Sequence, residues 1–206
     1  MLSLTLIIIL VTAAFSILAF SRTELMARYQ FNAYMIHHRK QYYRFITHAF
    51  LHADWLHLII NMLVLYSFGQ FVEGNLRYYF GGLSPVLYLI LYFGAVILSS
   101  LTTYKKHKDD HWYNAVGASG AVSAVMFSRV VFGPFMMIYL YGIIPLPALI
   151  WAALYVGYSV YAGRKANDNI NHDAHLWGGL FGMVFTLVLS PDIASRFLDQ
   201  LTGYFK

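Results

Sequence analysis

The chain alternates between long uncharged stretches and short charged connections. Runs without Arg, Lys, Asp or Glu cover residues 1–21, 55–72, 78–104, 111–128, 130–163 and 174–191. A helix needs about 20 mostly apolar residues to cross a bilayer, so five of these runs can each hold one span. The run 130–163 is too long for one straight helix and contains Pro134, Pro145 and Pro147, which interrupt helices. We therefore expect a lead-in segment near 135–144, followed by a span.

This pattern predicts an all-α membrane protein, a bundle of six transmembrane helices formed by one domain, residues 1–206. The expected spans are about 2–20, 56–72, 84–103, 116–131, 146–162 and 174–190. The first run has no basic segment before it, which favours a retained helix over a cleavable signal peptide. Residues 22–54 are rich in Tyr, His and Arg and predict a long interfacial first loop. Apolar residues at helical spacing in 192–206 predict a short amphipathic tail.

Composition supports the membrane assignment and excludes several classes. Apolar residues make up 59% of the chain and charged residues only 11%, against about a quarter charged in soluble domains. Aromatic residues reach 18%, which excludes disorder. The absence of cysteine excludes disulfides, thiolate nucleophiles and Cys-ligated metals. The net charge of +5 without a basic stripe indicates contacts with the lipid bilayer and no nucleic-acid partner.

The basic residues also suggest an orientation. The loops after the first, third and fifth spans carry ten Lys and Arg residues, and the side with the termini carries four. The positive-inside rule, taken alone, places the N-terminus outside.

Strongly polar residues inside spans are costly and are therefore candidates for a functional site. His57 and Asn61 are four residues apart at the start of the second span, so they share a helical face and can both donate to a developing oxyanion. In the alternative interpretation, Asn61 links helices and His57 lies at the interface. His48 and His52, also four apart, are interpreted either as half a metal site or as structural hydrogen-bonding groups in the loop.

A small-residue segment, Gly117-Ala118-Ser119-Gly120, opens the fourth span. Its glycines allow a tight turn and the close approach of another helix. A serine at a helix N-terminus has free backbone N–H groups beside it, which an oxyanion can use. The alternative is helix packing with Ser119 as an ordinary cap. Ser123, one turn further on, is expected to bond to the Ser119 carbonyl.

One face of the last span carries a histidine followed by glycines: His175, Gly178, Gly179 and Gly182. We expect this face to meet the Gly117 and Ala121 side of the fourth span. His175 would then lie within about 2.6–3.2 Å of the Ser119 hydroxyl. The alternative is a packing stripe with an interfacial histidine above it.

Together these residues supply a nucleophile, a base and oxyanion donors. The second, fourth and sixth spans begin on the same side of the membrane, so the three sites lie at similar depth. No carboxylate is embedded nearby, and Asp173, two residues before His175, is expected to point elsewhere. The pattern favours a Ser–His dyad over a triad.

Three segments, THAFLHADWLHLIINM, GASGAVSAV and AHLWGGLFG, resemble in order the motifs of rhomboid intramembrane serine proteases. The resemblance spans about residues 43–182. It implies that Ser119 is the nucleophile, that His175 is the general base, and that His57, Asn61 and the Ser119 N–H form the oxyanion hole. The glycines at 117, 120, 178 and 182 support these residues. The resemblance also implies cleavage of single-pass transmembrane protein substrates, with no metal, nucleotide or other cofactor.

The chain departs from that family's motifs in three ways, the mildest being Tyr43-Arg44 in the first loop, where the family has Trp-Arg. The aromatic residue that stacks on the catalytic histidine in some members would fall at Ser123, so another group must orient His175. The Glu-x-Arg after the second span is broken, because Glu73 is followed by Arg77 at the wrong spacing. The family orientation, with cytosolic termini, contradicts the charge count. We follow the family, because much of the excess charge lies in a loop where arginine can snorkel to headgroups, and expect a bacterial cytoplasmic membrane protein.

Two other classes stay open. One is an inactive rhomboid-like binding or chaperone module, which would normally have lost the serine or the histidine. The other is a membrane protein with a His-ligated metal or cofactor, which would use His48, His52, His57, His172 and His175. The second class leaves the Ser119 segment unexplained, and metal content would discriminate it.

Overall fold

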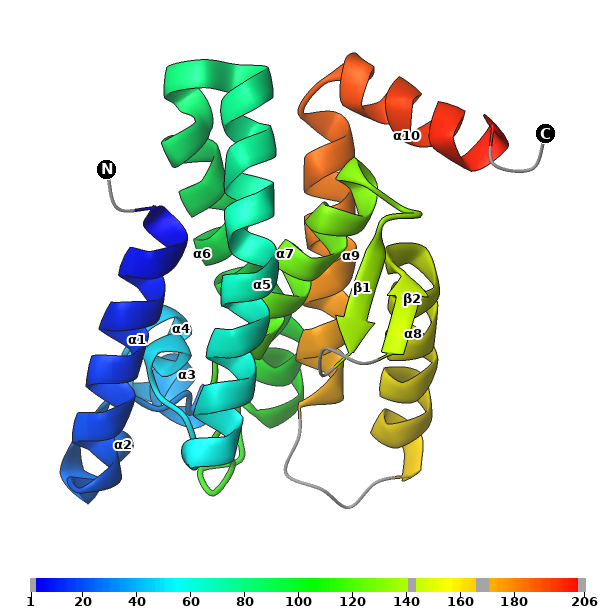
Figure 1. The fold of residues 1–206 in the computed structure, drawn as a ribbon. Coiled ribbons are helices and arrows are strands. Elements are labelled where there is room, and N and C mark those ends of the chain that lie inside the picture. The colour runs from blue at the N-terminus through cyan, green and yellow to red at the C-terminus, as the bar shows by residue number, and fades with distance from the viewer. Residues whose placement is uncertain (1–2, 141–143, 166–170, 204–206) are drawn as a thin grey trace.

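The fold is known from a computed structural model that describes residues 3–140, 144–165 and 171–203. Its long helices are α1 (Leu4–Phe20), α5 (Trp55–Phe80), α6 (Ser84–His107), α7 (Ser119–Phe132), α8 (Ala148–Lys165) and α9 (His172–Val188). Helix α7 contacts α5, α6, α8 and α9, so it lies at the centre of the bundle (Figure 1). Because α7 is central and short, its first turn begins inside the bundle.

Length and hydropathy identify few clear spans among the described residues. One stretch, Trp55–His107, qualifies; it holds α5 and α6, which run side by side and are joined by the 3₁₀ turn η2 (Gly81–Leu83) (Figure 1). A second span is possible if α9 and α10 (Pro191–Gly203), bent by 111°, count as one. Helices α1 and α7 are apolar but shorter. The number of six spans stays a prediction.

The segment expected as the first loop contains three short helices and a 3₁₀ turn: α2 (Thr23–Tyr29), α3 (Ala33–Arg39), α4 (Arg44–Thr47) and η1 (His48–Phe50). Arg44 holds them together. Its Nη1 donates to the carbonyls of Ala27 (3.0 Å) and Gln30 (2.6 Å), and its Nε donates to Gln41 Oε1 (2.7 Å). Arg44 is buried, so this arginine binds carbonyl groups and does not reach headgroups.

The lead-in segment contains a small sheet that the all-α prediction missed. Strand β1 (Met137–Leu140) pairs antiparallel with β2 (Ile144–Pro147); residues 141–143 lie outside the described part. Pro145 and Pro147 cannot continue a helix because they lack an N–H. They are two residues apart, and alternate residues of an antiparallel strand turn the N–H away from the partner. A two-stranded hairpin therefore accepts both prolines.

The acidic residue at the broken Glu-x-Arg position binds the first helix. The Glu73 carboxylate accepts hydrogen bonds from the backbone N–H of Leu4 (2.9 Å) and from both the N–H (3.1 Å) and the hydroxyl (3.0 Å) of Thr5. A negative charge is favourable at a helix N-terminus, where N–H groups lack partners. Glu73 thus links α5 to the start of α1.

Helix α10 follows the end of α9, bends sharply away from it and contacts α9 and α7 (Figure 1). Ile193 and Phe197 are buried and pack against Val131 of α7. Residues 204–206 of the expected tail lie outside the described part, as do residues 166–170 of the fifth loop.

Candidate active site

The glycine face of α9 packs directly on the backbone of α7. A Cβ atom at Gly178 would lie 2.1 Å from the carbonyl oxygen of Gly120, and one at Gly182 would lie 2.1 Å from the carbonyl oxygen of Ala124. Backbone atoms cannot move aside, so both positions require glycine. The nearest backbone contacts of Gly178 and Gly182 are thus Gly120 and Ala124, beside the Gly117 and Ala121 positions that were expected to face α9. Ala121 is one residue further round the helix and is buried in the main core.

This contact brings the ends of the two helices together. Ser119 is the first residue of α7 and directly precedes Gly120, while His175 lies in the first turn of α9. The carbonyl oxygen of Ala174 is 3.4 Å from the point that a Gly120 Cβ would occupy. Ser119 and His175 are both half-buried. The expected nucleophile and base therefore lie at the same end of one helix–helix contact.

The turn before Ser119 is shaped around the His57 ring. Gly117 has φ +125°, a conformation that favours glycine. A Cβ there would lie 2.8 Å from His57 Cε1 and 3.0 Å from His57 Nε2. The Gly117 N–H donates to the carbonyl of His48 (3.0 Å). Within the described part of the chain no side chain caps α7, and the N–H groups at the start of a helix can bind an anion.

Helix α5 presents His57 as a donor towards this turn. Asp54 caps the helix by accepting from the His57 backbone N–H (2.8 Å). The Ala53 N–H makes a long hydrogen bond, 3.5 Å, to His57 Nδ1. If Nδ1 is the acceptor, the proton of the neutral ring is on Nε2, the nitrogen beside Gly117. Asn61 shares this face and is buried; one of its amide N–H groups donates to the His57 carbonyl (2.9 Å).

Tyr155, which the sequence analysis did not identify as a site residue, packs against His175. The Ser123 hydroxyl donates to the Ser119 carbonyl (2.8 Å), which confirms the expected bond. Ser123 Oγ also lies 2.6 Å from the hydroxyl of Tyr155 on α8. The Tyr155 ring stacks on His175, with centroids 5.8 Å apart and planes 25° apart. The only sequence signal for this contact was the missing aromatic residue at position 123.

Asp173, the acidic residue closest to His175 in the sequence, is engaged elsewhere. Asp173 Oδ2 accepts from Lys106 Nζ, at the end of α6. Asn171 caps α9 by accepting from the Ala174 N–H (3.1 Å) and donates to Thr103 Oγ1 (2.7 Å). Asp173 thus points away from His175, as expected, and no triad carboxylate comes from this position.

His48 and His52 are structural residues of the loop. His52 Nδ1 lies 2.9 Å from the Ser16 hydroxyl, which donates to the Phe50 carbonyl (2.9 Å). Burial lowers the pKa of His48 to about 4 and that of His52 to about 3, since an apolar surrounding disfavours the charged imidazolium. Both rings are therefore neutral at pH 7.

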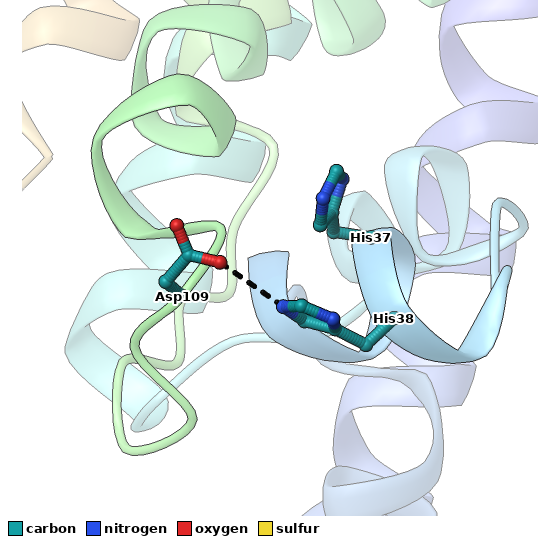
Figure 2. Close-up of side chains that lie close together, drawn as sticks. All are labelled: His37, His38 and Asp109. Atoms are coloured by element: carbon teal, nitrogen blue, oxygen red, sulfur yellow. Dashed lines mark hydrogen bonds and ion pairs between the residues drawn. The ribbon is translucent and has the colours of Figure 1, made fainter.

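The five histidines of the metal interpretation do not converge. The rings of His52 and His57 are 4.9 Å apart and those of His172 and His175 are 5.9 Å apart, but among the described residues these histidines form no group of three possible ligands. The metal-compatible group found among the described residues lies elsewhere and contains His37, His38 and Asp109 (Figure 2).

The ligand atoms of His37, His38 and Asp109 lie within 4.8 Å of one another. His38 Nε2 already pairs with Asp109 Oδ1 at 3.1 Å, and His37 Nδ1 lies 2.9 Å from the Tyr104 hydroxyl. These three residues could hold a divalent ion at the protein surface. The group includes neither Ser119 nor His175.

Known proteins share sequence with most of this chain. The model of the Rhomboid domain family matches residues 39–192. RHOMBOID-like protein 12, mitochondrial, from Arabidopsis thaliana is 33% identical over 141 residues, covering 65% of this chain and 42% of that protein. Rhomboid-like protein 11, chloroplastic, from the same plant is 30% identical over 185 residues, covering 81% of this chain and 59% of that protein. The chain spans about half the length of these relatives, whose names give no support to a bacterial inner membrane.

Proposed function

The chain belongs to the rhomboid family of membrane-embedded proteins, and from this premise we propose that it is an intramembrane serine endopeptidase. It would hydrolyse peptide bonds in or near the transmembrane helices of single-pass membrane proteins. Ser119 and His175 form the catalytic dyad, and the reaction uses no metal or nucleotide.

The observation that carries this proposal is the backbone contact between α7 and α9. Gly178 on Gly120 and Gly182 on Ala124 leave no room for a side chain between the helices, so the two backbones lie in direct contact. Such a contact keeps a nucleophile and a base in one geometry, and fixed orientation supplies much of the rate in enzyme reactions. A stripe of this kind at the far end of the helices would serve packing alone; here it starts beside Ser119 and His175.

The arrangement supports an acyl-transfer mechanism. His175 takes the proton from the Ser119 hydroxyl as its oxygen attacks the scissile carbonyl carbon. The oxyanion of the tetrahedral intermediate accepts hydrogen bonds from the Ser119 N–H, from His57 and from Asn61. His175 then protonates the departing amine as the peptide C–N bond breaks. In the second half His175 takes a proton from water as the water oxygen attacks the acyl carbon, and it returns this proton to the Ser119 oxygen as the ester bond breaks and the carboxyl product leaves.

The test is cleavage of a transmembrane reporter by wild-type, Ser119→Ala and His175→Ala proteins in proteoliposomes, with the cut site read by mass spectrometry. Each substitution should abolish cleavage, and the double variant should be no worse, because the two residues act as a unit. Ser67→Ala is the matched control, since Ser67 is exposed on α5 and bonds only within its own helix to Leu63. Cleavage by folded Ser119→Ala protein contradicts the proposal.

A second measurement separates the protease from an inactive binding module. A fluorophosphonate should add to Ser119 of the wild-type protein and not of the His175→Ala variant, because attack by the hydroxyl needs the base. A protein that binds the reporter but neither cleaves it nor reacts with the probe would be a rhomboid-like binding module.

A further inference from the structure

The base of a Ser–His dyad must be held by some group other than a carboxylate. In hydrolytic sites the base is usually oriented by a third group. Asp173 cannot serve, because its carboxylate binds Lys106. The side chains packed against the ring of His175 are therefore candidates for this role.

Tyr155 is placed to hold the ring of His175. Its ring is nearly parallel to that of His175, at 25°, and the 5.8 Å between centroids lies in the range of offset stacking. The Tyr155 ring also lies near α7, with its centroid 6.1 Å from that of Phe127 and the two ring planes tilted by 60°. Tyr155 thus lies between α7 and α9.

The hydroxyl of Tyr155 is tied to the residue that carries the nucleophile. Ser123 donates its single hydroxyl proton to the Ser119 carbonyl, so it accepts the proton of Tyr155 across their 2.6 Å contact. Two successive hydrogen bonds therefore run from Tyr155 through Ser123 to Ser119. They set the plane of the stacking ring relative to the backbone of Ser119 itself.

From this geometry we propose that Tyr155 is the positioning residue of the dyad. Tyr155 of α8 supplies an aromatic ring beside His175. In some rhomboid family members the corresponding ring would come from the position of Ser123. The small Ser123 side chain leaves room for that ring and anchors its hydroxyl, so the two residues act as a pair. This inference rests on the proposed protease function, because it assigns the group that orients the base of that reaction.

The test compares Tyr155→Ala, Tyr155→Phe, Ser123→Ala and the Tyr155→Phe, Ser123→Ala double variant. Misplacing a reacting group by about 1 Å can cost about 100-fold in rate, so Tyr155→Ala should lower kcat by about 10- to 100-fold with little change in KM. Tyr155→Phe keeps the ring and should retain most of the rate. Ser123→Ala removes both hydrogen bonds and Tyr155→Phe removes only one of them, so the double variant should be no worse than Ser123→Ala alone.

A second readout isolates the base from substrate binding. The rate at which a fluorophosphonate labels Ser119 depends on His175 and needs no transmembrane substrate, so it should fall in parallel with kcat. Leu154→Ala is the matched control on the same helix; Leu154 is 55% exposed, and its loss should leave kcat and labelling near the wild-type values. Thermal unfolding is recorded for every variant.

The outcomes separate the two proposals. If Ser119→Ala protein still cleaves the reporter, the protease function fails and this inference fails with it. If Ser119→Ala is inactive but folded Tyr155→Ala keeps wild-type kcat and labelling, only the positioning role is wrong. If Tyr155→Ala does not fold, the Tyr155→Phe, Ser123→Ala double variant tests the positioning role. A loss of kcat in the double variant equal to the sum of the two single losses would contradict the shared hydrogen bond. A loss in Leu154→Ala as large as that in Tyr155→Ala would also contradict it.

Discussion

Replacing Gly178 by alanine perturbs the α7–α9 contact at one known point. The new Cβ would lie 2.1 Å from the Gly120 carbonyl oxygen, 2.8 Å from its carbonyl carbon and 3.0 Å from its Cα. All three are backbone atoms, so no side chain can rotate away. Ordinary contact begins at 3.4 Å, so the helices must separate locally by about 1.3 Å, the difference between that and 2.1 Å.

That displacement sets the expected magnitudes. Overpacking of this kind costs about 1–3 kcal/mol of stability. A misplacement of about 1 Å between reacting groups costs about 100-fold in rate. We therefore expect Gly178→Ala to unfold at a lower temperature and to cleave the reporter about 100-fold more slowly, with the loss mainly in kcat.

The assay is steady-state cleavage in proteoliposomes, paired with a thermal unfolding curve on the same sample. Gly74→Ala on α5 is the matched control, because nothing lies within 4 Å of a Cβ there. In a helix interior that change should stabilise slightly, by about 0.5–1 kcal/mol. Wild-type stability and rate in Gly178→Ala would refute the packing argument. Reduced stability with unchanged kcat would show that the contact does not position the dyad.

Three further predictions follow from other parts of the molecule. Asn61→Ala and His57→Ala should each lower kcat by about 10²–10³-fold with KM nearly unchanged, as expected for oxyanion donors; wild-type kcat in the folded double variant would exclude this role. Burial lowers the pKa of His48 from 6.5 to about 4. The folded protein therefore keeps the full stability contributed by the neutral ring above pH 6.5 and loses about 3 kcal/mol of unfolding free energy as the pH falls towards 4. The slope of thermal stability against pH should therefore be shallower in a folded His48→Gln variant. For topology, an impermeant maleimide applied to intact cells should label Lys108→Cys and not Gly82→Cys in this cysteine-free chain; the reverse would support the positive-inside count.

Local chemistry could be predicted from sequence because helical spacing places residues on one face. The bond from Ser123 to the Ser119 carbonyl spans one helical turn, and the shared face of His57 and Asn61 spans the same distance. The glycine face of α9 followed in the same way. Each of these features needs only the period of the helix and the chemistry of the side chains.

Only the tertiary structure decided which faces meet. The period of α9 shows that Gly178 and Gly182 point one way, but not that they meet Gly120 and Ala124, because the rotation of α7 depends on α5 and α6 as well. The ring that stacks on His175 comes from Tyr155, 32 residues from Ser123, in a helix without a motif. Contacts between residues so far apart in the chain are set by the packing of whole helices, and periodicity along one helix carries no information about that packing.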